Sequence, residues 1–166
     1  MINWSFDGSK YSKDDERLVP EGLYRVRITK AEESISKSNG NQMIVMTLEV
    51  NGYEDLPYPL VNYLVFNPEK QGYTNQQLGR IFDSFKIQAG DLEVEHWVGK
   101  DGGAEIIVEE SEYNGRKRKQ NRVKKFLIRE EVDHLPAWEK PVNTGEVINS
   151  EMVNFDAEPN ADSLPF

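Results

Sequence analysis

The sequence predicts a mainly β protein: a five-stranded Greek-key barrel with one α-helix between the third and fourth strands and a disordered acidic C-terminal tail. Three observations carry this prediction. Five short segments alternate between apolar and polar residues or are rich in β-branched residues, which is typical of half-buried strands. One segment has the 3.6-residue period of an amphipathic helix. Asn-Gly pairs, which readily adopt positive φ, lie between several of the strands.

The first predicted strand covers residues 22–33, and the second covers residues 42–50 after a segment rich in turn formers. The third covers residues 58–66, where Pro57 and Pro59 limit the point at which pairing can begin. The predicted core faces of the first two strands consist of Tyr24, Val26, Ile28, Ile44, Met46, Leu48 and Val50.

The predicted helix covers residues 74–85, with Thr74 and Gln77 at capping-box spacing. Its apolar face consists of Leu78, Ile81, Phe82 and Phe85. Two further strands follow over residues 104–110 and 122–128, joined by an Asn-Gly turn. The absence of crossover helices argues against a doubly wound α/β fold, and the element order is the one expected of an OB-fold.

Charge divides the chain into parts. The formal net charge is −9, yet residues 130–166 carry nine acids and one base, a net of −8. Residues 1–129 are nearly neutral, and within them residues 116–129 hold eight bases and no acid. A basic strip indicates a polyanionic partner, and an acidic tail indicates a separate task. We therefore predict an arm or edge strand over residues 1–20, a binding domain over residues 21–129 and then the tail.

Several functional classes lack support. The chain has no cysteine, which fits a reducing cytoplasm and excludes thiolate metal sites. No apolar run is long enough to span a membrane, and the N-terminus lacks the pattern of a signal peptide. His96 and His134 have no partners at metal-ligand spacing, and the stretch GKDGG at residues 99–103 is not a phosphate loop. The sequence therefore predicts neither catalysis nor a metal or other cofactor.

OB-folds bind oligonucleotides on the second and third strands and with the loops that here fall on residues 34–42 and 111–121. Single-strand binders combine a cationic groove along the phosphates with aromatic faces on which bases stack. The predicted cationic residues are Arg25, Arg27, Lys37, Arg116, Lys117, Arg118, Lys119, Arg122 and Lys124. The predicted stacking residues are Tyr113, beside the basic cluster, and Tyr63 and Trp97, for which a place in the core is an equally good interpretation. A solvated surface loop is the alternative interpretation of the basic cluster.

The chain ends in Leu164, Pro165 and Phe166, close to Asp162. An acidic tail with little apolar surface does not compensate the entropy lost if it is ordered in a core. The apolar tip is better explained as a peptide offered to another protein, with Phe166 in an apolar pocket and Asp162 and the α-carboxylate at a basic rim.

This terminus resembles the tail tip of bacterial single-stranded DNA-binding proteins, which end in several Asp followed by Ile-Pro-Phe. It departs from that pattern in having one nearby Asp, with Ser163 where an acid is common. The body contains the stretches EGLYRVRITKAE (21–32), SKSNGNQMIVMTLEV (36–50), YLVFNP (63–68), LGRIFDSF (78–85) and EYNGRKRKQNRVKKFL (112–127). In these stretches it resembles a family of phage-encoded proteins of unassigned function, often encoded among replication and recombination genes.

The resemblance implies single-stranded DNA binding in phage replication or recombination, in the cytoplasm of an infected bacterium. It supplies no established set of binding residues. We expect binding that is largely independent of sequence, recruitment of phage or host replication and recombination proteins by the tail tip, and no membrane partner; homo-oligomerisation is left open. The rival interpretations are a phage protein–protein adaptor without affinity for single strands, a metal-dependent nuclease or recombination enzyme, and an RNA-binding protein.

Overall fold

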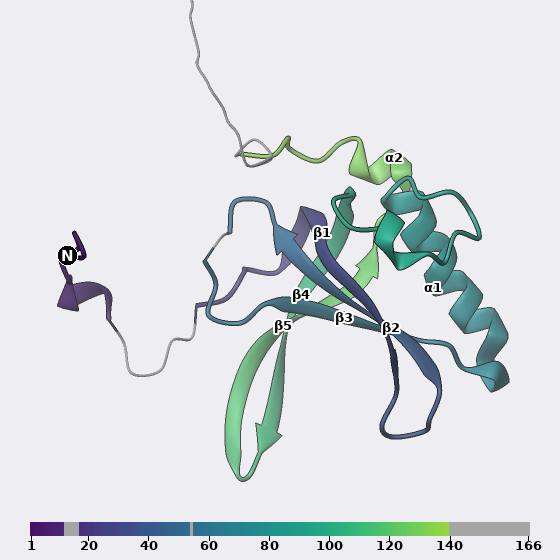
Figure 1. Cartoon of the computed structure of the whole chain (residues 1–166), viewed down its shortest axis with the longest axis horizontal. Coiled ribbons are helices and arrows are strands. Elements are labelled where there is room, and N and C mark those ends of the chain that lie inside the picture. Colours follow the sequence, from purple (N-terminus) through teal and green to yellow (C-terminus); the bar gives the residue numbers. More distant parts are fainter. Residues whose placement is uncertain (12–16, 54, 140–166) are drawn as a thin grey trace, which may run out of the picture.

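The computed structural model describes residues 1–11, 17–53 and 55–139. Within these ranges the strands are β1 (Gly22–Ile35), β2 (Gln42–Val50), β3 (Leu60–Val65), β4 (Asp101–Tyr113) and β5 (Arg116–Phe126). The helices are α1 (Gln71–Ser84) and α2 (Arg129–Val132), with short 3₁₀ turns η1 (Gly8–Lys10), η2 (Pro68–Lys70) and η3 (Val94–His96). α1 follows β3 in the chain and lies along one side of the sheet (Figure 1). No helix in the described ranges is both long and apolar enough to cross a membrane.

The strands form one antiparallel sheet in the order β3-β2-β1-β4-β5. Its edges, β3 and β5, also contact each other, although no hydrogen-bonded ladder joins them among the described residues. The sheet therefore curls into a barrel that is open along one line, which we call the seam. A partly open five-stranded barrel with its helix between β3 and β4 has the architecture of an OB-fold, which confirms the predicted fold class.

The core follows the predicted alternation. On β2, every second residue is buried, and these are Ile44, Met46, Leu48 and Val50. On β1, Val26 and Ile28 are buried and Tyr24 is half-buried. A bulge between Ile28 and Lys30 then shifts the register with β2 and ends the alternation. Burial of each such aliphatic side chain contributes about 1.5–3 kcal/mol to the hydrophobic stabilisation.

The helix begins one turn earlier than predicted, and the predicted capping box at Thr74 is wrong. The Asn67 side chain accepts a hydrogen bond from the backbone N–H of Glu69 (2.9 Å), and this cap starts η2, which leads directly into α1. Thr74 consequently lies in the first turn of α1, buried, with its hydroxyl 3.4 Å from the Asn67 nitrogen. The sequence analysis missed this cap because Asn67 caps the 3₁₀ turn η2, which comes before the first apolar residue of the helical pattern.

The β4–β5 hairpin is longer than the two predicted strands. Its strands continue to a two-residue turn at Asn114 and Gly115, both with positive φ (52° and 76°). This is the backbone that a type I′ hairpin turn requires, and it continues the ladder to the tip. The polar residues of both strands are therefore paired, and the hairpin projects beyond the barrel (Figure 1).

Ser84 fixes the end of α1 to the start of β4. Its fully buried hydroxyl donates to the carbonyl oxygen of Gly103 (3.0 Å) and accepts from the Gly103 backbone N–H (2.9 Å). A Cβ atom added at Gly102 would lie 2.8 Å from the backbone oxygen of Ser84 and 2.9 Å from the ring of Phe85. The close approach of helix and strand therefore requires glycine at Gly102.

Gly102→Ala is expected to lower the free energy of unfolding by roughly 1–3 kcal/mol, because backbone atoms must move to admit the methyl group. Gly79→Ala is the matched control: on α1, a Cβ at Gly79 meets no atom within 4 Å. The higher helix propensity of alanine should raise stability there by about 1 kcal/mol. Urea unfolding followed by circular dichroism measures both variants. Shifts of the same sign would contradict the close approach at Gly102.

Residues 128–139 form a strap across one end of the barrel, so the packed body continues past residue 129. Arg25 holds the strap, since its guanidinium donates to the carbonyl oxygens of Val132, Leu135 and Pro136 at 2.9–3.2 Å. Hydrogen bonds from a charged donor are among the stronger ones in proteins.

The end of the strap is fixed by Asn51, which follows β2. Its amide donates to the carbonyl oxygen of Ala137 (2.9 Å) and accepts from the backbone N–H of Glu139 (2.7 Å). One asparagine thus satisfies two backbone groups of the strap. The predicted tail therefore contains a folded first part, up to residue 139.

Candidate nucleic-acid interface

A groove of about 560 Å³ lies at the seam between β3 and β5. It is lined by residues 17–19, residues 56 and 58–63, and residues 118–123. Three parts of the chain that are far apart in sequence therefore meet along the open edge of the barrel. Asn121 of β5 joins two of these parts by hydrogen bonds. Its side chain accepts from the backbone N–H of Val19 and donates to the carbonyl oxygen of Val19, both at 2.8 Å.

Two tyrosines present exposed rings at the groove. Tyr63 on β3 is 62% exposed, and Tyr58, just before β3, is 57% exposed. The guanidinium carbon of Arg118 lies 3.8 Å from the ring centroid of Tyr58, in a cation–π contact. The groove thus combines flat aromatic faces with a cation at one place.

Three of the four lysines of β5 stand opposite acids of β4. Lys117 pairs with Glu112, and Lys119 pairs with Glu110. Directly opposed residues of an antiparallel pair share one face of the sheet. The lysine face of the hairpin is therefore balanced in charge. Lys119 also lines the groove, whereas Lys117 does not.

The arginines of β5 lie on the other face. Arg116, Arg118 and Arg122 are opposite residues without charge, and Glu109 is the acid that reaches this face, at 2.9 Å from Arg122. This arginine face, defined by Arg116, Arg118 and Arg122, carries a net positive charge. The basic strip of the sequence is therefore an arginine face that stays cationic and a lysine face that β4 neutralises.

Two predicted cations do not reach the groove, and their placement in it is wrong. Arg25 holds the strap. Arg27 is buried at the other end of the barrel, where its guanidinium carbon lies 4.1 Å from the ring centroid of Trp138 and its Nε lies 3.7 Å from an oxygen of Asp101. The indole N–H of Trp138 donates to the same Asp101 (3.1 Å). The side chains of Arg25 and Arg27 therefore both contact the strap.

Trp97 is a core residue, so its prediction as a stacking residue is wrong. It is 0% exposed, its ring packs edge-on against Phe82, and its indole N–H donates to the carbonyl oxygen of Asp91 (3.0 Å). A core position was the alternative interpretation of Trp97 from the sequence. The loop around it mixes apolar and charged residues without a helix or strand period, so no pattern decided between the two.

The other predicted residues have mixed positions. Lys37 is exposed in the turn between β1 and β2, and Lys124 is exposed on β5 outside the groove lining. Tyr113 is the last residue of β4, in register with Arg116, and its stacking role stays a prediction. The tail residues Asp162, Leu164, Pro165 and Phe166 lie outside the described residues. Tyr58 was missed, although an aromatic residue between two prolines, outside strand pairing, is a signal for exposure.

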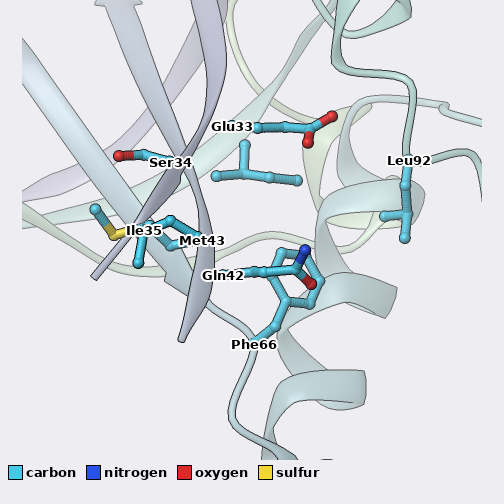
Figure 2. A pocket seen from close by; sticks show the side chains of 8 residues that line it. Glu33, Ser34, Ile35, Gln42, Met43, Phe66 and Leu92 are labelled. Atoms are coloured by element: carbon cyan, nitrogen blue, oxygen red, sulfur yellow. The ribbon is translucent and has the colours of Figure 1, made fainter. Parts of the chain in front are cut away.

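A second hollow, of about 410 Å³, lies near the turn between β1 and β2 (Figure 2). Ile35, Met43, Phe66 and Leu92 give it an apolar lining, and the carboxylate of Glu33 is among its polar groups. None of its lining residues is a lysine or an arginine. A hollow with an acid and without a cation is not suited to a phosphate backbone.

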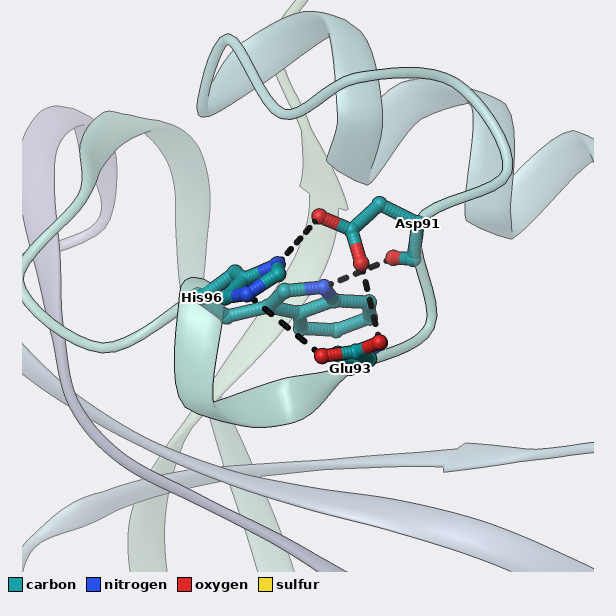
Figure 3. A network of polar contacts seen from close by, with 4 residues as sticks. Asp91, Glu93 and His96 are labelled. Carbon is teal, nitrogen blue, oxygen red and sulfur yellow. Dashed lines mark hydrogen bonds and ion pairs between the residues drawn. The ribbon is translucent and has the colours of Figure 1, made fainter.

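In the loop that covers Trp97, a histidine side chain contacts the carboxylates of two acids (Figure 3). His96 Nδ1 lies 2.7 Å from the Asp91 carboxylate, and His96 Nε2 lies 3.5 Å from that of Glu93. The hydrogen bond with Asp91 raises the pKa of His96 above its usual value, and the same bond lowers the pKa of Asp91. Across the described residues, no group of three acidic or histidine side chains could hold a metal ion.

The raised pKa of His96 implies that protonation stabilises the folded protein. This contribution is fully present below the unfolded-state pKa, about 6.5, and is lost as the pH rises through the higher folded-state value. We expect the melting temperature to fall more in the wild type than in His96→Gln between about pH 6 and about pH 8. Calorimetry of both proteins measures the difference. Parallel pH profiles would mean that the contact contributes nothing.

A family profile described as "Protein of unknown function (DUF669)" matches residues 4–127. The chain belongs to this family. The match covers the barrel, both edges of the seam and the N-terminal residues from Trp4 onward, and it ends before the strap. The DUF669 description assigns no activity.

Other comparisons add little to the DUF669 match. The chain is similar to a solved structure titled "Yeast RPA bound to ssDNA", with 12% sequence identity over 76% of this chain and 88% of that chain, and a TM-score of 0.35. The fold assignment rests on strand order and not on this similarity. No curated protein matches the chain.

Proposed function

We propose that this protein binds single-stranded DNA in the groove at the seam, largely without sequence preference. The observation that carries the proposal is the contact of Arg118 with the exposed ring of Tyr58 beside the arginine face. A single strand offers π-faces and phosphates together, and this part of the groove offers the partner for each.

The binding mode follows from the groove lining. Bases stack on Tyr58 and Tyr63, with Arg118 moving from ring to phosphate or covering the outer face of the base. Phosphates run along the arginine face. Every base has a π-face and every nucleotide has a phosphate, so neither contact selects a sequence.

The proposal includes binding without turnover and recruitment of partners by the tail. The acidic chain end with Leu164 to Phe166 supports capture by a basic, apolar pocket of a phage or host replication or recombination protein. Deletion of residues 157–166 should then keep or raise affinity for DNA and abolish binding of the partner.

Fluorescence anisotropy of a labelled oligo-dT, titrated with the full chain at several salt concentrations, tests the proposal. A duplex and an oligo-U of equal length are the controls. Tight binding of the DNA single strand over both, weakening with salt, would support it. Absence of binding at low salt would overturn it and favour the adaptor.

Tyr58→Ala should weaken binding of the single strand by about 1–3 kcal/mol, the value of one stacked base, without changing the salt slope. The stacking contact is lost while the phosphate contacts stay. Tyr73→Ala is the matched control, because Tyr73 is an exposed tyrosine on α1 away from the groove. The same anisotropy assay serves, and equal affinities of the two variants would remove Tyr58 from the site.

A further inference from the structure

The N-terminal residues 1–11 expose an unusual amount of aromatic surface. Trp4 is 82% exposed and Phe6 is 73% exposed, and Tyr11 is exposed as well. In Figure 1 this segment, which we call the arm, stands apart from the barrel. Clustered exposed apolar side chains mark an interaction site more often than isolated ones do.

The arm is attached at the groove. Residues 17–19 line it, and Asn121 holds Val19 against β5. Phe6 is eleven residues from Arg17 in the sequence. A chain of that length spans up to about 36 Å, so Trp4 and Phe6 are within reach of a strand bound in the groove.

The spacing and charge of the arm suit a single strand. Side chains two residues apart on an extended segment lie about 6.7 Å apart on one face, twice the roughly 3.4 Å separation of stacked bases. One base would fit between Trp4 and Phe6 when this part of the arm is extended, although in the free protein the ring centroid of Phe6 lies 6.4 Å from that of Tyr11. The charged side chains of the arm are Asp7 and Lys10, whose charges cancel, so the arm itself does not repel phosphates.

We propose that Trp4 and Phe6 stack on bases of the single strand bound in the groove. This inference rests on the proposed function and extends it from the barrel to the arm. It makes the arm a second stacking platform, in addition to the tyrosines of the seam. The family match, which begins at Trp4, includes both stacking residues.

The test uses the full chain and its Trp4→Ala/Phe6→Ala variant with labelled oligo-dT. The variant should bind at least about tenfold more weakly, with the salt slope unchanged. Ile2→Ala, which removes an exposed apolar side chain without a π-face, is the matched control and should bind like the wild type. Saturating unlabelled oligo-dT should quench tryptophan emission in the wild type and much less in Trp4→Phe.

The outcomes separate the two proposals. Wild-type binding with unchanged affinity of the double variant and no quenching from Trp4 would overturn the inference and leave the proposed function standing. Absence of wild-type binding would overturn both. Sedimentation of the free proteins gives the remaining outcome: a wild-type dimer that the double variant loses would assign the arm to a second copy of the chain and overturn the inference.

Discussion

Replacing Arg118 and Arg122 together by alanine is expected to weaken binding of a single strand by on the order of 10–100-fold at low salt. Both side chains line the groove from the cationic face of β5. Each lost phosphate contact removes about 0.7 from the slope of log K against log salt, so the slope should flatten by about 1.4. Anisotropy titrations of oligo-dT at several salt concentrations measure both quantities.

Lys117→Ala/Lys125→Ala is the matched control for this pair. It removes the same charge from the same strand, but the two lysines stand opposite Glu112 and Glu105 and neither lines the groove. We expect its affinity and slope to stay close to those of the wild type. An equal loss from both double variants would show that net charge, and not position at the seam, governs binding.

Trp97→Ala is expected to lower the free energy of unfolding by about 3–5 kcal/mol, the usual loss for a large aromatic side chain removed from a core. That is a large share of the roughly 5–15 kcal/mol that stabilises a typical domain. The ring of Phe82 loses its partner and the carbonyl oxygen of Asp91 loses its donor. Chemical unfolding followed by circular dichroism measures the effect.

Trp97→Phe keeps most of the apolar volume and provides a folded protein if the alanine variant does not fold. At a temperature at which it is fully folded, it should bind oligo-dT with the affinity of the wild type. A stable variant at this position with reduced DNA affinity would return Trp97 to the binding site and contradict its assignment to the core.

The features that depend on local sequence could be predicted. The alternation of buried and exposed residues on β2 follows directly from its side-chain pattern. Asn114 and Gly115 supply the positive φ values that the turn of the β4–β5 hairpin needs. The position of the helix between β3 and β4 follows from the change in period. These signals act over a few residues, where propensity and periodicity determine the structure.

The features that depend on distant partners could not be predicted. Arg25 and Arg27 alternate with core residues as a solvent face would, but their partners in the strap lie more than a hundred residues away in the sequence. The burial of Trp97 involves a nearer contact, with the carbonyl oxygen of Asp91 six residues before it, in a loop that has no helix or strand period. A single sequence holds no local signal for these contacts.

The division of the basic strip into an arginine face and a lysine face is intermediate between features with a local signal and features with distant partners. The Asn-Gly turn fixes the register, and from the register Lys117 and Lys119 fall opposite glutamates. The neutralised face could therefore have been derived by counting outward from the turn. The prediction considered the charges along one strand and did not pair them across two, so the role of these lysines in binding stays a prediction.

The seam has a mechanical consequence. Across it, β3 and β5 meet through side chains and not through main-chain hydrogen bonds among the described residues. Small changes in the distance between the two strands therefore strain no ladder. In a closed barrel, main-chain hydrogen bonds between the two edge strands would oppose such changes. Under the proposed function, purines and pyrimidines, which differ in width, would enter the same site at similar elastic cost, and the open barrel would add tolerance of base identity to that given by the side chains.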